Sequence, residues 1–395
     1  MKIERIILFT KGIETLSFFS EQLGKTFSKL GYEVFYFDQC KSYDSLAELL
    51  LFANPEATAA VTFNFDGCCG EGYFIDCKGI HLFDDRKIPV INIVVDHPFY
   101  YHKFLPFLPK DYCQISIDRE HEAYLQYYFP EIKRGPFLPL AGTSLWKDTL
   151  PKWEERPYDV VFTGNYTPLS KFEPTIERHG KEYADFYYGI IEDFKKHPHL
   201  GMDIGIREHL LSEVEDITED GVKEMMPNMI MIDLYVRNYF RGKVVQTLVD
   251  AGVSVHCFGA GWEFLPCEHP ENLIKEGGVD SLACLQALSK AKVSLNVMPW
   301  FKDGAHDRVF NSMLNGAVCF TDWSRYLAEN LRDGEDIFFY ELDALECLPD
   351  MVQGILENRK KWEHMQKAAY ETAEKSHTWE HRAGAVHKEI LSKIR

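Results

Sequence analysis

The chain has 395 residues, of which 46% are hydrophobic and 14% aromatic, so two domains with well-packed cores are expected. Its 43 Lys and Arg residues face 61 Asp and Glu residues, which leaves a formal net charge of −18. That balance excludes broad electrostatic binding to nucleic acid or to anionic lipid, so any phosphate must be held by a local group of residues.

The N-terminal residues and the cysteines indicate a soluble, cytoplasmic protein. The opening MKIERIILFT has one short apolar run and no small-residue cleavage site. No stretch of the chain approaches the roughly 18 apolar residues of a transmembrane segment. The ten cysteines are scattered and lack the spacing of a zinc or redox motif, which predicts reduced and mostly buried thiols.

Short apolar runs alternate with helical periods in residues 1–150. RIILFT is expected to be a strand, TLSFFSEQLGKTFSKLG an amphipathic helix, and YEVFYFD the next strand. The rhythm continues through AAVTFNFDG, PVINIVVDHP, YCQISIDREHEAYLQYYFP and GPFLPLAG. An open, doubly wound parallel sheet of five or six strands is therefore predicted for this N-terminal domain.

The composition changes near residue 150, where TSLWKDTLPKWEERPYD contains two prolines and little periodicity, and DVVFTGN then restarts as a buried strand. Residues 166–237 are polar and acidic, which predicts a helical insertion. The α/β rhythm then returns from NYFRGKVVQTLVDAG onward. A second doubly wound domain is expected over residues 151–375, with a cleft between the two domains.

Two loops in this second domain follow expected strands and contain glycine. In FTGN, Gly164 and Asn165 could let backbone amides approach a phosphate or a sugar, although a plain turn is an alternative. In CFGAGW, Gly259 and Gly261 precede Trp262 and could cradle a base or a diphosphate. The full G-x-G-x-x-G fingerprint is lacking, which disfavours a nicotinamide or flavin site.

A third loop, DGAHDRVFNSMLNG, leads from an expected strand into an expected helix. Residues 304–308 should then lie at a helix N-terminus, where unpaired N–H groups and the helix dipole favour an anion. Arg308 can grip two phosphate oxygens at once. Asp307 is either a ligand-side residue or the N-cap of the helix.

The order of VSVHCFGAGW, SLNVMP, DGAHDRVFNSMLNGAVCFTD, LRDGEDIFFY and SHTWEHRAGAVHKEIL resembles the C-terminal half of the CgeB-like glycosyltransferases. These are similar to the retaining GT-B transferases of groups 1 and 4. VVDHPF and ISIDREHEAYL resemble the N-terminal domain joined to such enzymes in bacteria. The resemblance implies two Rossmann-like domains facing a cleft, a donor-binding second domain, and a helix over residues 376–395 that packs toward the first domain.

In the broader group, two glutamates eight positions apart contact the donor sugar and the ribose. Here Asp303 and Asn311 stand at these positions (311 − 303 = 8), so the chain departs from the pattern at both. Asp303 would orient the sugar, and Asn311 would bind a ribose hydroxyl without a charge. The resemblance implies a leaving diphosphate stabilised by Arg308, with Lys243 or Arg241.

The loop amides expected to help at the diphosphate complete the donor-side set, namely Gly304, Ala305, His306 and Asp307. In the first domain, His97 follows a buried strand and could contact the donor sugar or act on an acceptor hydroxyl, with a capped turn before Pro98 as the alternative. Acceptor-side candidates at other strand ends are Gly12, Asn64, Asp66 and Asp96.

These expectations predict a glycosyltransferase that uses a nucleotide sugar, with a UDP-sugar favoured, and a protein, polysaccharide or small molecule as acceptor. A nucleotide-sugar epimerase of the same fold and a non-catalytic nucleotide- or glycan-binding protein are the alternatives. No cofactor beyond the donor is expected. No metal is expected either, because no D-x-D motif stands at a convincing strand end.

Overall fold

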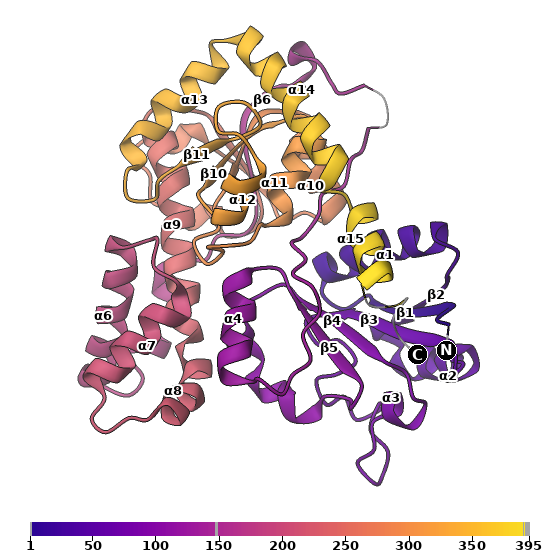
Figure 1. Ribbon diagram of the computed structural model, residues 1–395. Coiled ribbons are helices and arrows are strands. Elements are labelled where there is room, and N and C mark those ends of the chain that lie inside the picture. Colours follow the sequence, from indigo (N-terminus) through magenta and orange to yellow (C-terminus); the bar gives the residue numbers. More distant parts are fainter. Residues whose placement is uncertain (1, 147–148, 390, 392–395) are drawn as a thin grey trace. The chain divides into compact units, whose positions relative to one another are not determined.

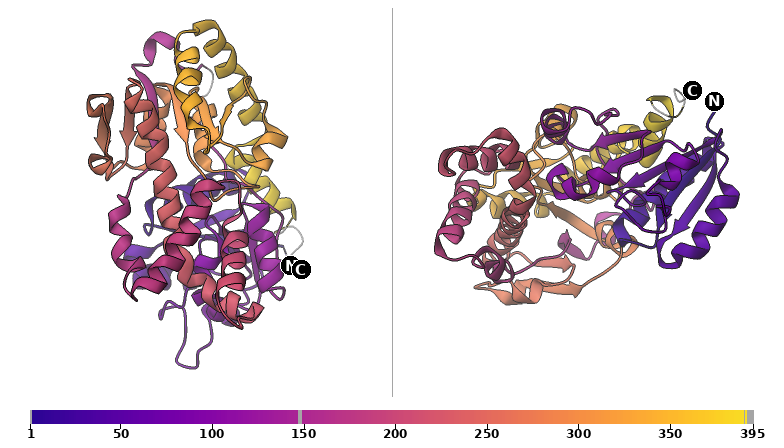
Figure 2. Two further views of the ribbon diagram at one scale, coloured as in Figure 1. Left: turned by 90° about the vertical axis from the view of Figure 1, so that its left-hand side faces the viewer. Right: turned by 90° about the horizontal axis from the view of Figure 1, so that it is seen from below.

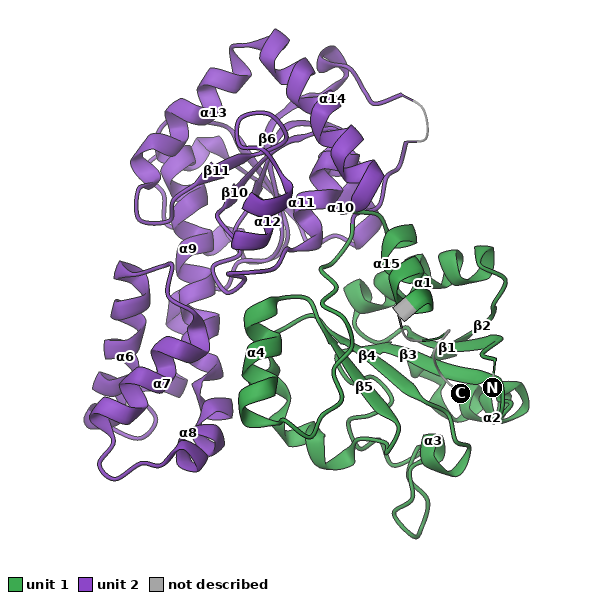
Figure 3. Cartoon of the chain, viewed as in Figure 1, with its two compact units in different colours: residues 1–141, 377–395 green, residues 142–376 purple. Residues whose placement is uncertain are grey.

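The computed structural model describes residues 2–146, 149–389 and 391 (Figure 1). The chain divides into two compact units, shown in Figure 3: unit 1 is Met1–Ala141 with His377–Arg395, and unit 2 is Gly142–Ser376. Residues 390 and 392–395 of the expected C-terminal helix lie outside the described residues, as do 147 and 148 near the expected boundary. No described helix is long and apolar enough to cross a membrane.

Unit 1 contains a five-stranded parallel sheet in the order β2-β1-β3-β4-β5. The strands are β1 (Arg5–Thr10), β2 (Glu33–Asp38), β3 (Thr58–Phe63), β4 (Val90–Val94) and β5 (Tyr112–Ser116). Every residue of β3, β4 and β5 is buried, as expected for a sheet covered on both faces. The run GPFLPLAG forms no strand, because Pro136 and Pro139 have no N–H to donate to a neighbour.

The C-terminal helix belongs to unit 1 and packs on its first helix. The helices of the unit are α1 (Glu14–Lys29), α2 (Ser42–Phe52), α3 (Leu82–Asp85), α4 (Arg119–Tyr128) and α15 (Trp379–Glu389), with 3₁₀ helices η1 (Gln39–Lys41) and η2 (Pro98–Phe107). The rings of Phe19 on α1 and Trp379 on α15 lie 5.0 Å apart. The Arg382 guanidinium donates to the carbonyls of Pro139 and Leu140 at 2.6 and 3.0 Å, which fixes α15 to the end of the N-terminal segment.

Unit 2 contains a six-stranded parallel sheet in the order β11-β10-β9-β6-β7-β8. The strands are β6 (Tyr158–Thr163), β7 (Val255–Phe258), β8 (Leu273–Gly277), β9 (Ala291–Asn296), β10 (Val318–Asp322) and β11 (Phe338–Tyr340). The helices outside the insertion are α10 (Ser281–Ser289), α11 (Asp307–Leu314), α12 (Arg325–Asn330), α13 (Leu348–Leu356) and α14 (Arg359–Ser376). The buried Arg156 donates to the carbonyls of Ala291 and Asn315 at 2.6 and 2.9 Å and so ties β9 to the end of α11.

The insertion between β6 and β7 is helical. It contains α5 (Glu173–Ile176), α6 (Lys181–Lys196), α7 (Met202–Glu213), α8 (Glu219–Met225) and α9 (Ile230–Asp250). Within unit 2, α6 packs on α9, and α7 and α8 pack on the 3₁₀ helix η5 (Met226–Met229) that precedes α9 (Figure 1 and Figure 2). Helix α9 continues past the expected limit of residue 237 and returns the chain to the sheet, so its second half belongs to the core of the unit.

Candidate functional site

The polar residues of unit 2 gather at the carboxyl ends of β6, β9 and β10. Gly164 directly follows β6, Asn296 ends β9, and Asp322 ends β10. The strands are parallel neighbours, so their carboxyl ends meet at one edge of the sheet, where ligands bind in open α/β folds.

Helix α11 begins at this edge with a polar N-terminus. His306 is the N-cap of α11, and its Nδ1 lies 3.2 Å from the backbone nitrogen of Arg308. Asp307 is therefore the first helical residue and not the cap, which corrects the structural alternative for that residue. Its Oδ1 lies 2.7 Å from the His306 Nδ1.

The charges of these two side chains follow from their surroundings. Burial lowers the pKa of His306 and the nearby Arg308 lowers it further, so the imidazole is neutral near pH 7. Burial acts to raise the pKa of Asp307, but His306 and Arg308 outweigh it and leave the pKa below its usual value. The loop thus holds a neutral imidazole beside a carboxylate.

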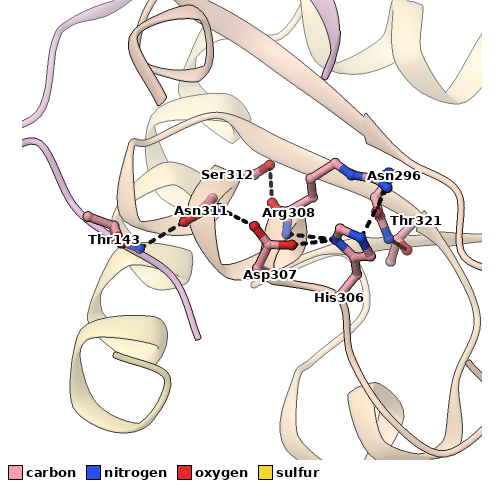
Figure 4. Close-up of polar contacts among 8 residues, drawn as sticks. All are labelled: Thr143, Asn296, His306, Asp307, Arg308, Asn311, Ser312 and Thr321. Atoms are coloured by element: carbon pink, nitrogen blue, oxygen red, sulfur yellow. Dashed lines mark hydrogen bonds and ion pairs between the residues drawn. The ribbon is translucent and has the colours of Figure 1, made fainter. Parts of the chain in front are cut away.

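Arg308 is oriented by neutral acceptors (Figure 4). Its Nη1 donates to Asn296 Oδ1 at 3.0 Å, and its Nη2 lies 3.2 Å from His306 Nε2. The guanidinium carbon lies 5.5 Å from the centre of the Phe162 ring. Asn296 is held in turn by a bond from its Nδ2 to Thr321 Oγ1 at 2.8 Å, so this guanidinium has a fixed direction.

A second guanidinium, Arg241 on α9, shares the Phe162 ring at 5.8 Å. Arg241 is 9% exposed, its Nη1 donates to the Asn165 carbonyl at 2.5 Å, and its buried Nε has no partner among the described residues. Burial lowers the pKa of Arg241 well below its usual range, and Arg308 adds to the effect. The two cations therefore repel each other where little water is present to screen their charges.

Neither Arg241 nor Arg308 forms an ion pair with a carboxylate in the part of the chain that the structure describes. Asp307 and Asp322 attract Arg308, and Asp233 attracts Arg241, but burial outweighs these carboxylates and the pKa of both arginines stays below its usual range. Two buried cations whose hydrogen bonds go only to neutral acceptors are costly, because a buried charge is stabilised mainly by a paired opposite charge. A ligand with two negative charges would supply that charge. The arrangement is a candidate site for a diphosphate.

Sequence reasoning missed a third arginine near this pair, Arg237, and Lys243 lies apart from the pair. Arg237, one turn before Arg241, donates to Asp233 Oδ2 at 2.7 Å and lies 4.0 Å over the Trp300 ring. The spacing of four residues between the two arginines in VRNYFRG was the available signal. Lys243 is exposed, and two residues along a helix is a turn of roughly 200°, so it faces away from Arg241 and does not join the pair of arginines.

The glycines of the two other predicted loops allow those loops to touch. A Cβ on Gly259 would lie 2.2 Å from the Gly164 carbonyl oxygen. A Cβ on Gly261, whose φ is 89°, would lie 1.9 Å from the Tyr166 carbonyl oxygen. Because a side chain at either position would clash with a backbone oxygen, these glycines let the two loops pack together, whether or not the loops bind a ligand.

Asn165 and Trp262 join the same two loops. Asn165 Oδ1 accepts from the Ala260 N–H at 2.9 Å, and Trp262 Nε1 donates to the Gly164 carbonyl at 2.8 Å. Trp262 is 1% exposed, so its ring has no free face on which a base could stack. The predicted donor contact of Trp262 is therefore contradicted, and the ring serves to hold the loops together.

Asp303 and Asn311, which stand where the broader group has its two glutamates, make contacts within the protein. Asp303 is buried and its Oδ2 lies 3.3 Å from Arg325 Nη1. Asn311 donates to Asp307 Oδ2 at 2.8 Å and accepts from the Thr143 N–H at 2.8 Å (Figure 4). Each end of its amide thus has one protein partner, and the role of Asn311 at a ribose hydroxyl stays a prediction.

The backbone that precedes α11 is also covered. Gly304 and Ala305 are buried, and the Gly304 carbonyl accepts from Ser324 Oγ at 2.7 Å. The partly exposed groups of the predicted anion loop are the side chains of His306 and Arg308.

In unit 1, His97 is 3% exposed. Its Nδ1 accepts from the Phe99 N–H at 3.3 Å and so caps η2, and the His121 ring lies 4.6 Å away. The structure therefore supports the capped turn before Pro98 and contradicts a catalytic role, because the imidazole has no surface that a substrate could reach.

The acceptor-side candidates form two groups at strand ends of unit 1. Asp96 Oδ2 accepts from Asn64 Nδ2 at 3.0 Å and from the Tyr101 hydroxyl at 2.8 Å. Asp66 Oδ2 accepts from Gln39 Nε2 at 3.0 Å. Burial raises the pKa of Asp66 to about 6.

The four predicted acceptor-side residues thus acquire two partners that were not predicted, Gln39 and Tyr101. Gly12 belongs to the Asp66 group, since a Cβ there would lie 2.5 Å from Gln39 Nε2. Asn64 belongs to the Asp96 group, and its φ of 45° is uncommon for a residue other than glycine.

One group of metal-ligating side chains occurs among the described residues. His199, Glu341 and Asp343 place one ligand atom each within 4.8 Å of one another, and all three are exposed. Among the described residues, none of the three forms a hydrogen bond or an ion pair with Arg241 or Arg308. Exposed acidic groups of this kind are common without an ion, so the cluster does not define a metal site.

Comparison with known proteins identifies the fold. Solved structures similar to the whole chain include sucrose-phosphate synthase from Thermosynechococcus elongatus, with a TM-score of 0.53, 12% identity and coverage of 99% of this chain and 100% of that one. The architecture is GT-B. An alpha-glucosyltransferase in complex with UDP and a 13-mer DNA containing an HMU base has a TM-score of 0.58, 11% identity and 100% coverage of both chains.

Another similar GT-B structure is Anabaena HepE in complex with UDP-glucose, with a TM-score of 0.54, 8% identity and coverage of 97% of this chain and 98% of that one. Residues 241–388 match the family model described as glycosyl transferase-like, a range that begins at Arg241 and includes Arg308. No curated protein matches the chain. The family match and the GT-B fold together support a glycosyltransferase.

Proposed function

We propose that the protein transfers a glycosyl group from a UDP-sugar to an acceptor, as a CgeB-like glycosyltransferase. The observation that carries the proposal is the pair of desolvated guanidiniums, Arg241 and Arg308, with only neutral acceptors at the carboxyl edge of the unit 2 sheet. A nucleoside diphosphate carries the charge that this pair lacks. The bound ligands of HepE and of the alpha-glucosyltransferase, UDP-glucose and UDP, favour uridine as the nucleoside.

In the proposed reaction the bond between the anomeric carbon and the diphosphate oxygen breaks, and negative charge develops on the leaving UDP. Arg308 and Arg241 offset that charge, with help from the N-terminal end of α11. Because their direction is fixed by Asn296, His306 and the Asn165 carbonyl, little reorganisation is needed as the charge develops. The guanidiniums fill the role that a divalent cation plays in other transferases, so we propose a metal-independent reaction.

We further propose that Asp303 orients the donor sugar and that the configuration at the anomeric carbon is retained. Asp303 precedes α11 in the same loop as Arg308 but is 3% exposed, so we propose that it acts on the sugar through the exposed Arg325, whose guanidinium it holds in place. The acceptor oxygen would form the new bond on the face that the diphosphate leaves, and its proton would pass to the departing phosphate oxygen. This step needs no additional base.

The acceptor hydroxyl is proposed to bind at unit 1. The carboxylates of Asp96 and Asp66 stand at strand ends there, each held by an amide side chain. Oriented carboxylates accept hydrogen bonds from hydroxyl groups, which are shared by polysaccharides, small molecules and the Ser and Thr side chains of proteins.

The proposal is tested by calorimetry with UDP, GDP and TDP and by product analysis with their sugars. Wild type should bind one nucleotide, and Arg308→Gln should bind it about 10- to 100-fold more weakly. Lys243→Gln is the matched control, since it removes a cation that faces away from Arg241, and it should bind normally.

Three results would contradict the transferase. If no nucleotide or nucleotide sugar binds wild type, the donor site is wrong. If a donor binds but is neither hydrolysed nor transferred to any acceptor, the protein is a binding protein. If the donor alone is converted to an isomeric nucleotide sugar, the protein is an epimerase.

A further inference from the structure

A groove in unit 2 is lined by residues that take no part in the proposed donor site. Its volume is about 410 Å³, within the range of roughly 300–1,000 Å³ found for small-molecule sites. Trp146, Thr149 and Leu150 line one side of it, and the face of α14 that contains Gln366, Tyr370 and Glu374 lines the other.

Trp146 on one side and Gln366 on the other are fixed by hydrogen bonds to the body of the unit. Ser144 Oγ lies 2.7 Å from the Trp146 carbonyl, 3.1 Å from the Trp146 N–H and 3.1 Å from the Leu314 carbonyl. Gln366 Nε2 donates to the carbonyls of Pro151 and Gly316 at 3.0 and 3.4 Å. These two lining residues therefore hold their positions before any ligand binds.

The lining combines aromatic rings with hydrogen-bond acceptors. Trp146 is 37% exposed, and Tyr370 also keeps part of its surface in solvent. The carbonyl oxygen of Gln366 receives no hydrogen bond from the described residues, because both of its contacts are made by the amide nitrogen. Glu371 and Glu374 add exposed carboxylates; Glu371 lies 3.8 Å from Lys367 Nζ and Glu374 accepts from the Tyr370 hydroxyl at 3.1 Å, and each carboxylate has further lone pairs.

This combination matches the two surfaces of a sugar ring. The C–H face of a pyranose is apolar and packs against the face of an aromatic side chain, whereas its hydroxyls donate to carboxylate and amide oxygens. The two glutamates of the groove outnumber its one lysine, Lys367, and the chain has a net charge of −18, so an anionic glycan is disfavoured.

We propose that this groove binds an uncharged oligosaccharide, at a site separate from the residues that hold the donor. The choice of a saccharide rests on the proposed glycosyltransferase function, but the groove and its chemistry do not depend on the donor site. An oligosaccharide bound in this groove would stay on the protein while its end serves as the acceptor.

The test is calorimetric titration of the full chain, without nucleotide, with cellohexaose, maltohexaose and the hexamer of N-acetylglucosamine. At least one hexamer should bind wild type, and Trp146→Ala should weaken that binding about ten-fold through the loss of ring stacking. Trp146→Phe keeps a ring and should lose less. Trp323→Ala is the matched control, because Trp323 is also 37% exposed but does not line the groove, and it should bind like wild type.

Thermal unfolding of each variant establishes that it is folded. The proposal is overturned if none of the three hexamers binds, or if Trp146→Ala binds the best hexamer as wild type does. It is also overturned if a hexuronate or a basic peptide binds the groove more tightly than every neutral hexamer. UDP titration of the same proteins separates the two proposals, since Arg308→Gln should lose UDP and keep the oligosaccharide.

Discussion

Replacing Arg241 by methionine should make the ligand-free protein no less stable while it weakens nucleotide binding. Arg241 is nearly buried, has no carboxylate partner among the described residues, and faces a second cation, Arg308. Methionine preserves an unbranched apolar chain in the same space. Stability and nucleotide affinity should change in opposite directions, because two neighbouring buried cations destabilise the folded protein until an anion binds to them.

The expected magnitudes follow from the contacts. The variant loses one charged hydrogen bond, from Nη1 to the Asn165 carbonyl, which costs about 1.5–3 kcal/mol. It also removes the desolvation of a cation that Asp233 and the Phe162 ring offset only in part, which is worth several kcal/mol. The free energy of unfolding without ligand should therefore stay constant or rise by about 2 kcal/mol. Affinity for UDP should fall about 10- to 100-fold, since a charged contact to phosphate is lost.

Urea unfolding of the ligand-free protein measures the first effect, and calorimetry with UDP measures the second. Arg237→Met is the matched comparison one turn away on α9. It breaks the ion pair with the buried Asp233 and should cost about 3–5 kcal/mol. If Arg241→Met destabilised the protein as much as Arg237→Met and left UDP affinity unchanged, Arg241 would be a structural residue and the anion-site argument would be refuted.

Three further predictions concern stability. Gly142→Ala should lower the free energy of unfolding in urea by about 2 kcal/mol, because its Cβ would lie 2.5 Å from the Phe310 carbonyl carbon. Gly354→Ala in α13 is the control: nothing lies within 4 Å of its Cβ, so it should raise the free energy of unfolding by about 0.5–1 kcal/mol. Equal effects of the two substitutions would contradict the packing argument. Burial raises the pKa of Asp322 to about 6, so the folded state binds this proton more tightly than the unfolded state, and the free energy of unfolding falls as the pH rises from about 4 to about 6. Asp322→Asn should therefore gain about 3 kcal/mol at pH 7.5 and almost nothing at pH 4, and a gain of the same size at both pH values would show that titration is not its cause. Asn311→Glu should lose about 2 kcal/mol, because its carboxylate would face that of Asp307; a stabilised variant would indicate that the position accepts the family glutamate.

Much of the fold could be predicted because its strands are parallel and buried, and such strands are nearly continuous apolar runs. β3, β4 and β5 show this directly. The failure at residues 135–142 has a local cause: Gly135 and Leu138 donate to β5, but Pro136 and Pro139 have no N–H and interrupt the pairing.

The candidate site was predictable only where its residues are close in sequence. The N-terminus of α11, with Arg308, was expected from a loop followed by a helical period. The contact between Arg241 and the Asn165 carbonyl joins residues 76 positions apart, and no periodicity indicates such a pairing. His97 failed for a related reason, because its position after a strand does not show that His121 and Tyr124 of α4 cover the ring.

The helical insertion is closed at its base, which makes it an exchangeable module. The Thr167 N–H donates to Asn238 Oδ1 at 2.8 Å, so the chain enters and leaves the insertion at one point although the two residues are 71 positions apart. A shorter or longer segment could span the same base at little entropic cost, since closure entropy changes only slowly with loop length. The segment between Thr167 and Asn238 is therefore the natural place to graft a foreign domain or a reporter into this fold.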